Sequence, residues 1–152
     1  MPSPTVAPPK FEKERDVIYG EVGGEPLLLD VYRPVGWPAP RPSVLVFHGG
    51  GLVFGSRGDV VEPARALAIA GYVAFAVEYR LFDPNTGANP WPAQLDDAQR
   101  AIRWVRANAA TYGVDPDRVA AYGHSSGGTL AVAVGVRETR DDGTPDPAGI
   151  SS

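Results

Sequence analysis

The chain has 152 residues, of which 43% are hydrophobic and 21% are charged, a composition typical of one globular domain with a single core. Its net charge of −4 argues against a nucleic-acid partner, and its lack of cysteine excludes disulfides and thiol catalysis. No apolar run is long enough to span a bilayer.

The two ends of the sequence differ from its middle. Residues 1–9 are rich in proline and lack the apolar stretch of a signal peptide, which favours a cytoplasmic location. Residues 137–152 are polar and contain Gly143, Pro145 and Pro147. We therefore predict a disordered leader over residues 1–15, a partial domain over 16–140 and a terminal loop over 141–152.

The first half of the domain predicts three strands and a helix. A hairpin turn at Gly23-Gly24 separates strands over 17–19 and 27–32, and the apolar run 43–47 is typical of a strand buried on both faces. A helix is expected to begin near Asp59, where Glu62 completes the spacing of a capping box, and to stop at Gly71.

The second half continues the alternation of strands and helices. The run 72–77 predicts a buried strand, and Trp91-Pro92 precedes an amphipathic helix that ends at Gly113. Asp96 and Arg100 are spaced as an ion pair on its polar side. A strand over 119–122, a glycine-flanked turn and an apolar helix over 129–136 follow. Such an order predicts an α/β fold, with a mostly parallel sheet and flanking helices.

The turn between the last strand and the last helix carries the strongest functional signal. It reads Gly123-His124-Ser125-Ser126-Gly127, which matches the G-x-S-x-G pattern of a nucleophile elbow. The glycines suit a turn too tight for side chains, and Ser125 would project its hydroxyl above the sheet. A glycine- and serine-rich surface loop is the plainer alternative, but the flanking strand and helix favour the elbow.

A second glycine-rich segment directly follows a buried strand. His48-Gly49-Gly50-Gly51 would let the backbone approach a substrate carbonyl and direct N–H groups at it, as an oxyanion hole does. A flexible glycine turn would have the same composition. The position of this segment, upstream of the elbow by a strand and a helix, favours the oxyanion role.

These motifs resemble the carboxylesterase and lipase family of the α/β-hydrolase fold, in its hormone-sensitive-lipase-like branch. The same resemblance extends to the stretches 29–34, 78–81, 91–94 and 115–118. The resemblance implies that Ser125 is the nucleophile and that backbone N–H groups of Gly50, Gly51 and Ser126 form the oxyanion hole. His48, Gly49, Gly123 and Gly127 would support them. It also implies a sheet of eight strands, of which this sequence supplies about five before it stops after the nucleophile helix.

The acid and the histidine of the triad are expected after the nucleophile in this family, and no histidine follows Ser125. His124 should point away from the serine proton, and the resemblance gives His48 a structural role in its loop. Acidic residues offer no clear alternative. Asp141, Asp142 and Asp146 are predicted to be solvated loop residues, and Asp115 and Asp117 turn residues. Asp96 and Asp97 are expected on the polar side of their helix, as cap or ion-pair residues. The alternative to an esterase is therefore a catalytically incomplete pseudo-hydrolase or fragment that acts as a binding or assembly partner.

A sheet with only about five of the eight strands that the resemblance implies also predicts an assembly surface. The strand over 119–122 should lie at the edge of the sheet with an apolar flank, where another chain can pair with it. A homo-oligomer or the missing C-terminal half would cover this edge. The resemblance suggests a small ester with a short acyl chain as substrate, with feruloyl esters, acetyl-sugar esters and amides as open alternatives. Phe54, Phe82 and Trp91 either line an apolar site near the loops or pack in the surface loops. No metal or organic cofactor is implied, because no His, Asp and Glu set has ligand spacing.

Overall fold

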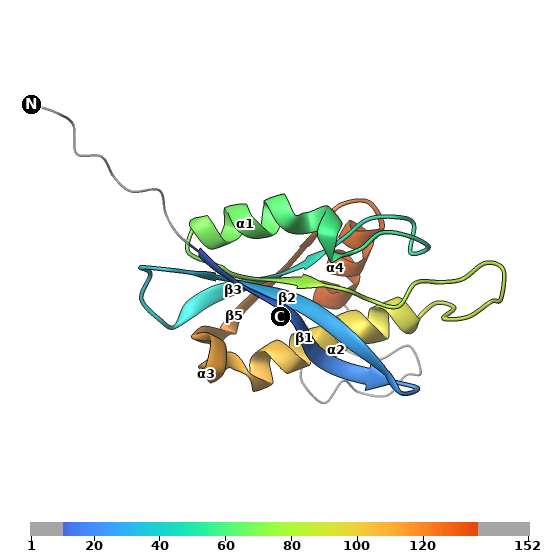
Figure 1. Ribbon diagram of the computed structural model, residues 1–152, viewed down its shortest axis with the longest axis horizontal. Coiled ribbons are helices and arrows are strands. Elements are labelled where there is room, and N and C mark those ends of the chain that lie inside the picture. Colours follow the sequence, from blue (N-terminus) through green and yellow to red (C-terminus); the bar gives the residue numbers. More distant parts are fainter. Residues whose placement is uncertain (1–10, 137–152) are drawn as a thin grey trace, which may run out of the picture.

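The computed structural model describes residues 11–136, which form one mixed sheet with helices on both faces (Figure 1). The strands are β1 (Phe11–Val22), β2 (Glu25–Pro34), β3 (Arg41–Phe47), β4 (Val73–Val77) and β5 (Val114–Gly123). The helices are the short 3-10 helix η1 (Arg57–Val60), α1 (Val61–Ile69), α2 (Ala93–Ala107), α3 (Ala109–Tyr112) and α4 (Ser126–Val136). None of the helices within this described part is long and apolar enough to cross a membrane.

The order of the strands in the sheet is β1-β2-β4-β3-β5. β3 lies between β4 and β5 and is parallel to both, whereas β2 is antiparallel to β1 and to β4. The prediction of a five-stranded partial α/β-hydrolase sheet is confirmed. β5, which leads into the candidate elbow, lies at an edge, while β3, which leads into the glycine-rich segment, is its neighbour.

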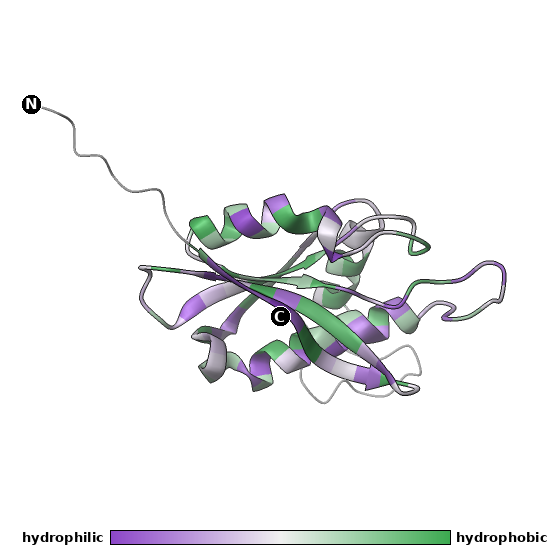
Figure 2. Ribbon diagram, in the orientation of Figure 1, coloured by the Kyte–Doolittle hydropathy of each residue, from purple (hydrophilic) through white to green (hydrophobic). Residues whose placement is uncertain are grey.

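Two hydrophobic clusters fill the two sides of the sheet, because successive side chains of a strand point to opposite faces. On one face, Val44, Val46, Ala74 and Ala76 pack with residues of α1. On the other face, the alternate residues of the same strands pack with α2, α3 and α4: Leu45, Phe47, Val73, Phe75, Val77, Leu95, Ile102, Tyr112 and Leu130. Figure 2 shows apolar and polar residues alternating along α1, as expected of a helix with one buried side.

Both outer strands are longer than their sequence patterns predict. β1 begins at Phe11, so residues 11–15 belong to the sheet and not to a leader. β5 begins at Val114, and its register with β3 jumps from Val114 to Val119. The skipped residues bulge out as the expected turn, in which the Asp117 N–H donates to Asp115 at 3.0 Å. Residues 1–10 of the predicted leader and the predicted loop 141–152 lie outside the described residues.

Two local predictions on the helices are wrong. The capping box is formed by Ser56 and Asp59 at the start of η1, one turn before the predicted pair. On α2, Asp97 is fully buried, not on a polar side, and Arg100 pairs with it at 3.1 Å. The spacing of charged residues along the helix could not show that Arg80, from the loop after β4, also pairs with this carboxylate.

Candidate active site

The turn between β5 and α4 has the backbone of a nucleophile elbow. Ser125 is exposed and adopts a φ of 54°, a left-handed conformation that is strained for any residue with a side chain. The Thr129 N–H donates to the Ser125 carbonyl at 3.1 Å, so the first turn of α4 starts at the serine itself. The helix therefore directs its positive N-terminal end at the place where Ser125 stands.

The glycines of the elbow (residues 123–127) are required by close backbone contacts. A Cβ on Gly127 would collide with the Phe47 carbonyl oxygen and lie 2.6 Å from the His48 carbonyl oxygen. A Cβ on Gly123 would collide with the backbone of Gly127. The elbow thus packs backbone against backbone on the end of β3, which a side chain at either glycine would prevent.

The segment between β3 and η1, called here the glycine loop (residues 48–55), lies against the elbow. Gly50 and Gly51 have φ values of 120° and 62°, and a Cβ on Gly50 would collide with the Phe54 backbone. The N–H groups of Val53 and Phe54 both donate to the Gly50 carbonyl, at 3.0 and 3.1 Å, and close the loop into a tight turn. The two motifs singled out in the sequence are therefore neighbours in space.

Both histidines of the chain belong to these motifs. His48 is fully buried and its Nδ1 lies 2.7 Å from the Gly49 carbonyl, so Nδ1 carries the proton and donates it. Its Nε2 is enclosed and has no hydrogen-bond partner among the described residues. The His124 Nε2 lies 3.0 Å from the position that a Cβ on Gly49 would take, beside the glycine loop.

The carboxylates considered from the sequence make structural contacts, and Asp115 lies at the opposite end of β5 from the elbow. Asp97 accepts hydrogen bonds from the Arg80 backbone N–H at 2.9 Å, from the Arg80 guanidinium, and from Arg100. Asp115 pairs with Arg118 in the β5 bulge, and these contacts hold the pKa of its carboxyl below the ordinary value. Asp96 is half-buried on α2. The predicted loop residues Asp141, Asp142 and Asp146 lie outside the described residues.

A mainly apolar hollow of about 410 Å³ opens beside the glycine loop. The residues that line it are Gly51, Leu52, Phe82, Pro90, Trp91 and Gln94. Phe82 and Trp91 thus line the hollow, whereas Phe54 is 70% exposed and does not. Leu52 adopts a left-handed φ of 65°, a strained conformation for a residue with a branched side chain. Sequence reasoning missed Leu52 and Gln94, although Gln94 belongs to a stretch that carries the family resemblance.

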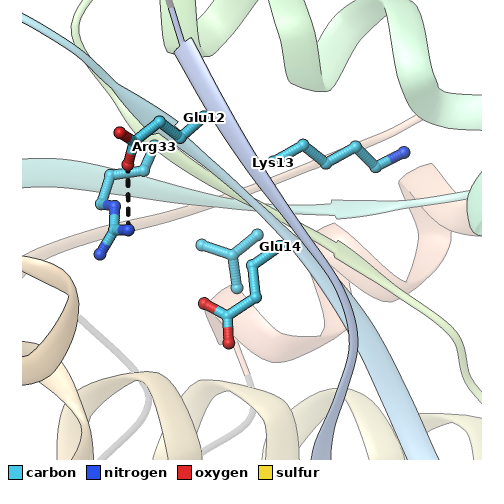
Figure 3. Close-up of a pocket in the computed structure, with 5 residues that line it drawn as sticks. Glu12, Lys13, Glu14 and Arg33 are labelled. Carbon is cyan, nitrogen blue, oxygen red and sulfur yellow. Dashed lines mark hydrogen bonds and ion pairs between the residues drawn. The ribbon is translucent and has the colours of Figure 1, made fainter.

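Further hollows lie elsewhere on the described part of the chain. One of about 330 Å³, shown in Figure 3, is lined by Glu12, Lys13, Glu14, Val31 and Arg33 of β1 and β2. Arg33 is paired with Glu12 at 3.1 Å there. These strands form the opposite edge of the sheet from β5, so this hollow lies away from the elbow. Among the described residues, no group of three or more His, Asp or Glu side chains could hold a metal ion.

Comparisons with known proteins agree with this geometry. Carboxylesterase NlhH of Mycobacterium tuberculosis is 38% identical over 144 residues, which are 91% of this chain and 43% of that protein. The esterase Est2 of Thermogutta terrifontis superposes with a TM-score of 0.76 at 32% identity, covering 95% of this chain and 50% of Est2. An esterase of Pyrobaculum calidifontis gives 0.71 at 36% identity, with coverages of 82% and 39%.

The chain thus spans about half the length of these relatives. The sequence model of the BD-FAE family matches residues 29–145, which include β3, the glycine loop and the elbow. The chain therefore belongs to the BD-FAE family, and its fold is that of the α/β-hydrolase esterases.

Proposed function

We propose that this chain carries the nucleophile and the oxyanion hole for hydrolysis of small carboxylic esters. The observation that carries the proposal is the left-handed, exposed Ser125 at the start of α4, in an elbow whose Gly127 lies against the His48 carbonyl. In this proposal the Ser125 hydroxyl attacks the ester carbonyl, and backbone N–H groups of Gly50, Gly51 and Ser126 stabilise the resulting oxyanion. The alcohol then leaves, and water releases the acid from the acyl-enzyme.

A short acyl chain is the proposed specificity. The hollow lined by Leu52, Phe82 and Trp91 adjoins the glycine loop at Gly51 and offers an apolar surface to the substituent of an ester bound there. Est2 of Thermogutta terrifontis is known with propionate and with butyrate bound. Both carboxylates have short, apolar alkyl chains, which supports the same class of acyl group for this chain. A cytoplasmic location stays a prediction.

The general base and the acid are proposed to come from a segment that covers the β5 edge. The surface of β5, α2 and α4 has a hollow of about 270 Å³ lined partly by Val119, Ala121 and Val134, and Tyr122 and Val132 nearby are 46% and 65% exposed. A missing C-terminal half or a second copy would bury this surface. Sedimentation should therefore show association of the isolated chain. A monomer with high thermal stability would contradict this proposal.

The test of the catalytic proposal compares the chain with its Ser125→Ala variant on a short-chain nitrophenyl ester. Activity that is lost in the variant supports Ser125 as nucleophile and shows that a base reaches it. Without a base, a loss on the order of 10⁴ to 10⁶ in rate is expected. Equal rates for the two proteins would favour the second candidate, a catalytically incomplete binding or assembly partner. The enclosed Nε2 of His48 favours that candidate for the chain on its own.

A further inference from the structure

The segment after β4 contacts the glycine loop at two points and contacts Arg57 just after it. Arg57, just beyond the loop, donates to Glu78 at 2.5 Å. Tyr79 contacts His48 at the beginning of the loop, and the Phe82 N–H donates to the Leu52 carbonyl at 2.8 Å in its middle. A loop with several left-handed residues has many accessible conformations, so contacts of this kind decide which one it adopts.

Tyr79 makes the most enclosed of these contacts. Its side chain is 2% exposed, and its ring stacks on the His48 imidazole at a centroid distance of 4.3 Å and an angle of 8°. Its hydroxyl donates to the His48 carbonyl oxygen at 2.7 Å. That carbonyl oxygen is also the atom that lies 2.6 Å from the place of a Cβ on Gly127. Burial raises the pKa of Tyr79, and the nearby Ser126 hydroxyl acts in the opposite direction.

The peptide that Tyr79 holds is the first one of the glycine loop. The His48 carbonyl and the Gly49 N–H belong to one planar unit, so a hydrogen bond to the oxygen fixes how the whole unit is rotated. Gly50 and Gly51 follow directly and have no side chains to restrict them. At the other end, Arg57 is held by Asp30 at 2.7 Å and by Asp16 at 2.9 Å as well as by Glu78. The loop is therefore fixed at both ends.

We infer that Tyr79 is a positioning residue, whose hydroxyl sets the orientation of the oxyanion-hole N–H groups through the His48 carbonyl. This inference rests on the proposed role of Gly50 and Gly51 in binding the oxyanion. Tyr79 acts at a distance from the substrate, through the backbone of the loop. Its ring fills space beside His48, and its hydroxyl supplies the directional contact.

The experiment compares Tyr79→Phe with Tyr19→Phe in the full chain. Tyr19 is a matched control, because it is 4% exposed and its hydroxyl also donates to a backbone carbonyl, that of Glu78 at 2.6 Å. Each variant keeps its ring and loses one buried hydrogen bond. The readouts are the ¹H–¹⁵N shifts and the amide hydrogen exchange of Gly49, Gly50 and Gly51, measured by NMR together with exchange in β3 and β4.

In Tyr79→Phe, the exchange rates of the three glycine amides should rise by roughly fivefold to tenfold from their wild-type values, after correction for any change in the central strands. This is the factor expected for one lost hydrogen bond. Their shifts should move, while those of Tyr19→Phe stay near the wild-type values. Unchanged loop amides in Tyr79→Phe, or equal changes in both variants, would overturn the inference. Neither readout depends on catalytic turnover, so the result can be interpreted even if the chain shows no esterase activity.

Discussion

The buried carboxylate of Asp97 gives the sharpest test of what holds helix α2 on the sheet. Asp97→Asn keeps the size of the side chain and removes its charge. The change would leave the guanidinium groups of Arg80 and Arg100 without their anion in a site where Asp97 has no exposed surface. Removing one partner of a buried ion pair costs about 3 to 5 kcal/mol.

The expected cost lies at the lower end of that range. Arg80 and Arg100 are 23% and 29% exposed, so both can turn partly toward water. The asparagine oxygen can also still accept the Arg80 backbone N–H, which now donates to Asp97 at 2.9 Å. We therefore expect a loss of about 3 kcal/mol in the free energy of unfolding, which for a domain of this size lowers Tm by about 10 °C.

Urea unfolding followed by circular dichroism measures this loss, with Glu62→Gln as the matched control. Glu62 is also a helical carboxylate paired with an arginine three residues later, but it is 81% exposed and 3.9 Å from Arg65. The control should change stability by less than about 0.5 kcal/mol. A cost below about 1 kcal/mol for Asp97→Asn, or equal effects of the two substitutions, would refute the view that this buried cluster fixes α2 to the β4 loop.

Three further predictions concern the elbow and the tyrosines. Gly127→Ala should lower the free energy of unfolding by about 3 kcal/mol, because the new Cβ collides with the β3 backbone. Gly135 has open space around it, so Gly135→Ala should raise the free energy of unfolding by about 0.5 kcal/mol. Urea unfolding midpoints of the two variants measure both changes. Ser125→Gly should be more stable than Ser125→Ala by about 1 kcal/mol, since only glycine relieves the left-handed φ, and equal melting temperatures would contradict this. Burial raises the pKa of Tyr19 and Tyr79. Above about pH 10 the unfolded chain loses phenol protons that the folded chain keeps, so the free energy of unfolding should fall as pH rises. An absorbance titration of phenolate in the folded and the unfolded chain checks this prediction.

The parts of the fold that follow from local pattern could be predicted from the sequence. The strand over 43–47 was a continuous apolar run, and the two glycine motifs followed strands, so their meeting at one end of a parallel sheet could be expected. The outer strand β1 could not, because residues 11–15 are mostly charged and only their pairing with β2 makes them a strand.

Contacts between distant residues account for the rest of the differences. Asp97 looked like a surface residue by its spacing, and it is buried because Arg80 reaches it from the β4 loop. The same holds for Tyr79, whose partner His48 is 31 residues away along the chain. A local pattern reports periodicity and turn chemistry, but such pairings depend on the loop path in three dimensions.

The backbone contact between the elbow and the end of β3 has a consequence for how this protein can change. Because Gly127 and Phe47 touch through main-chain atoms, no compensating side-chain substitution in β3 can make room for a larger residue at 127. In a saturation mutagenesis library, Gly50, Gly123 and Gly127 should tolerate almost nothing, while Gly51, which has open space around it, should accept asparagine. New substrate preferences would then arise by exchange of the side chains around the hollow, with the main-chain framework of the site left as it is.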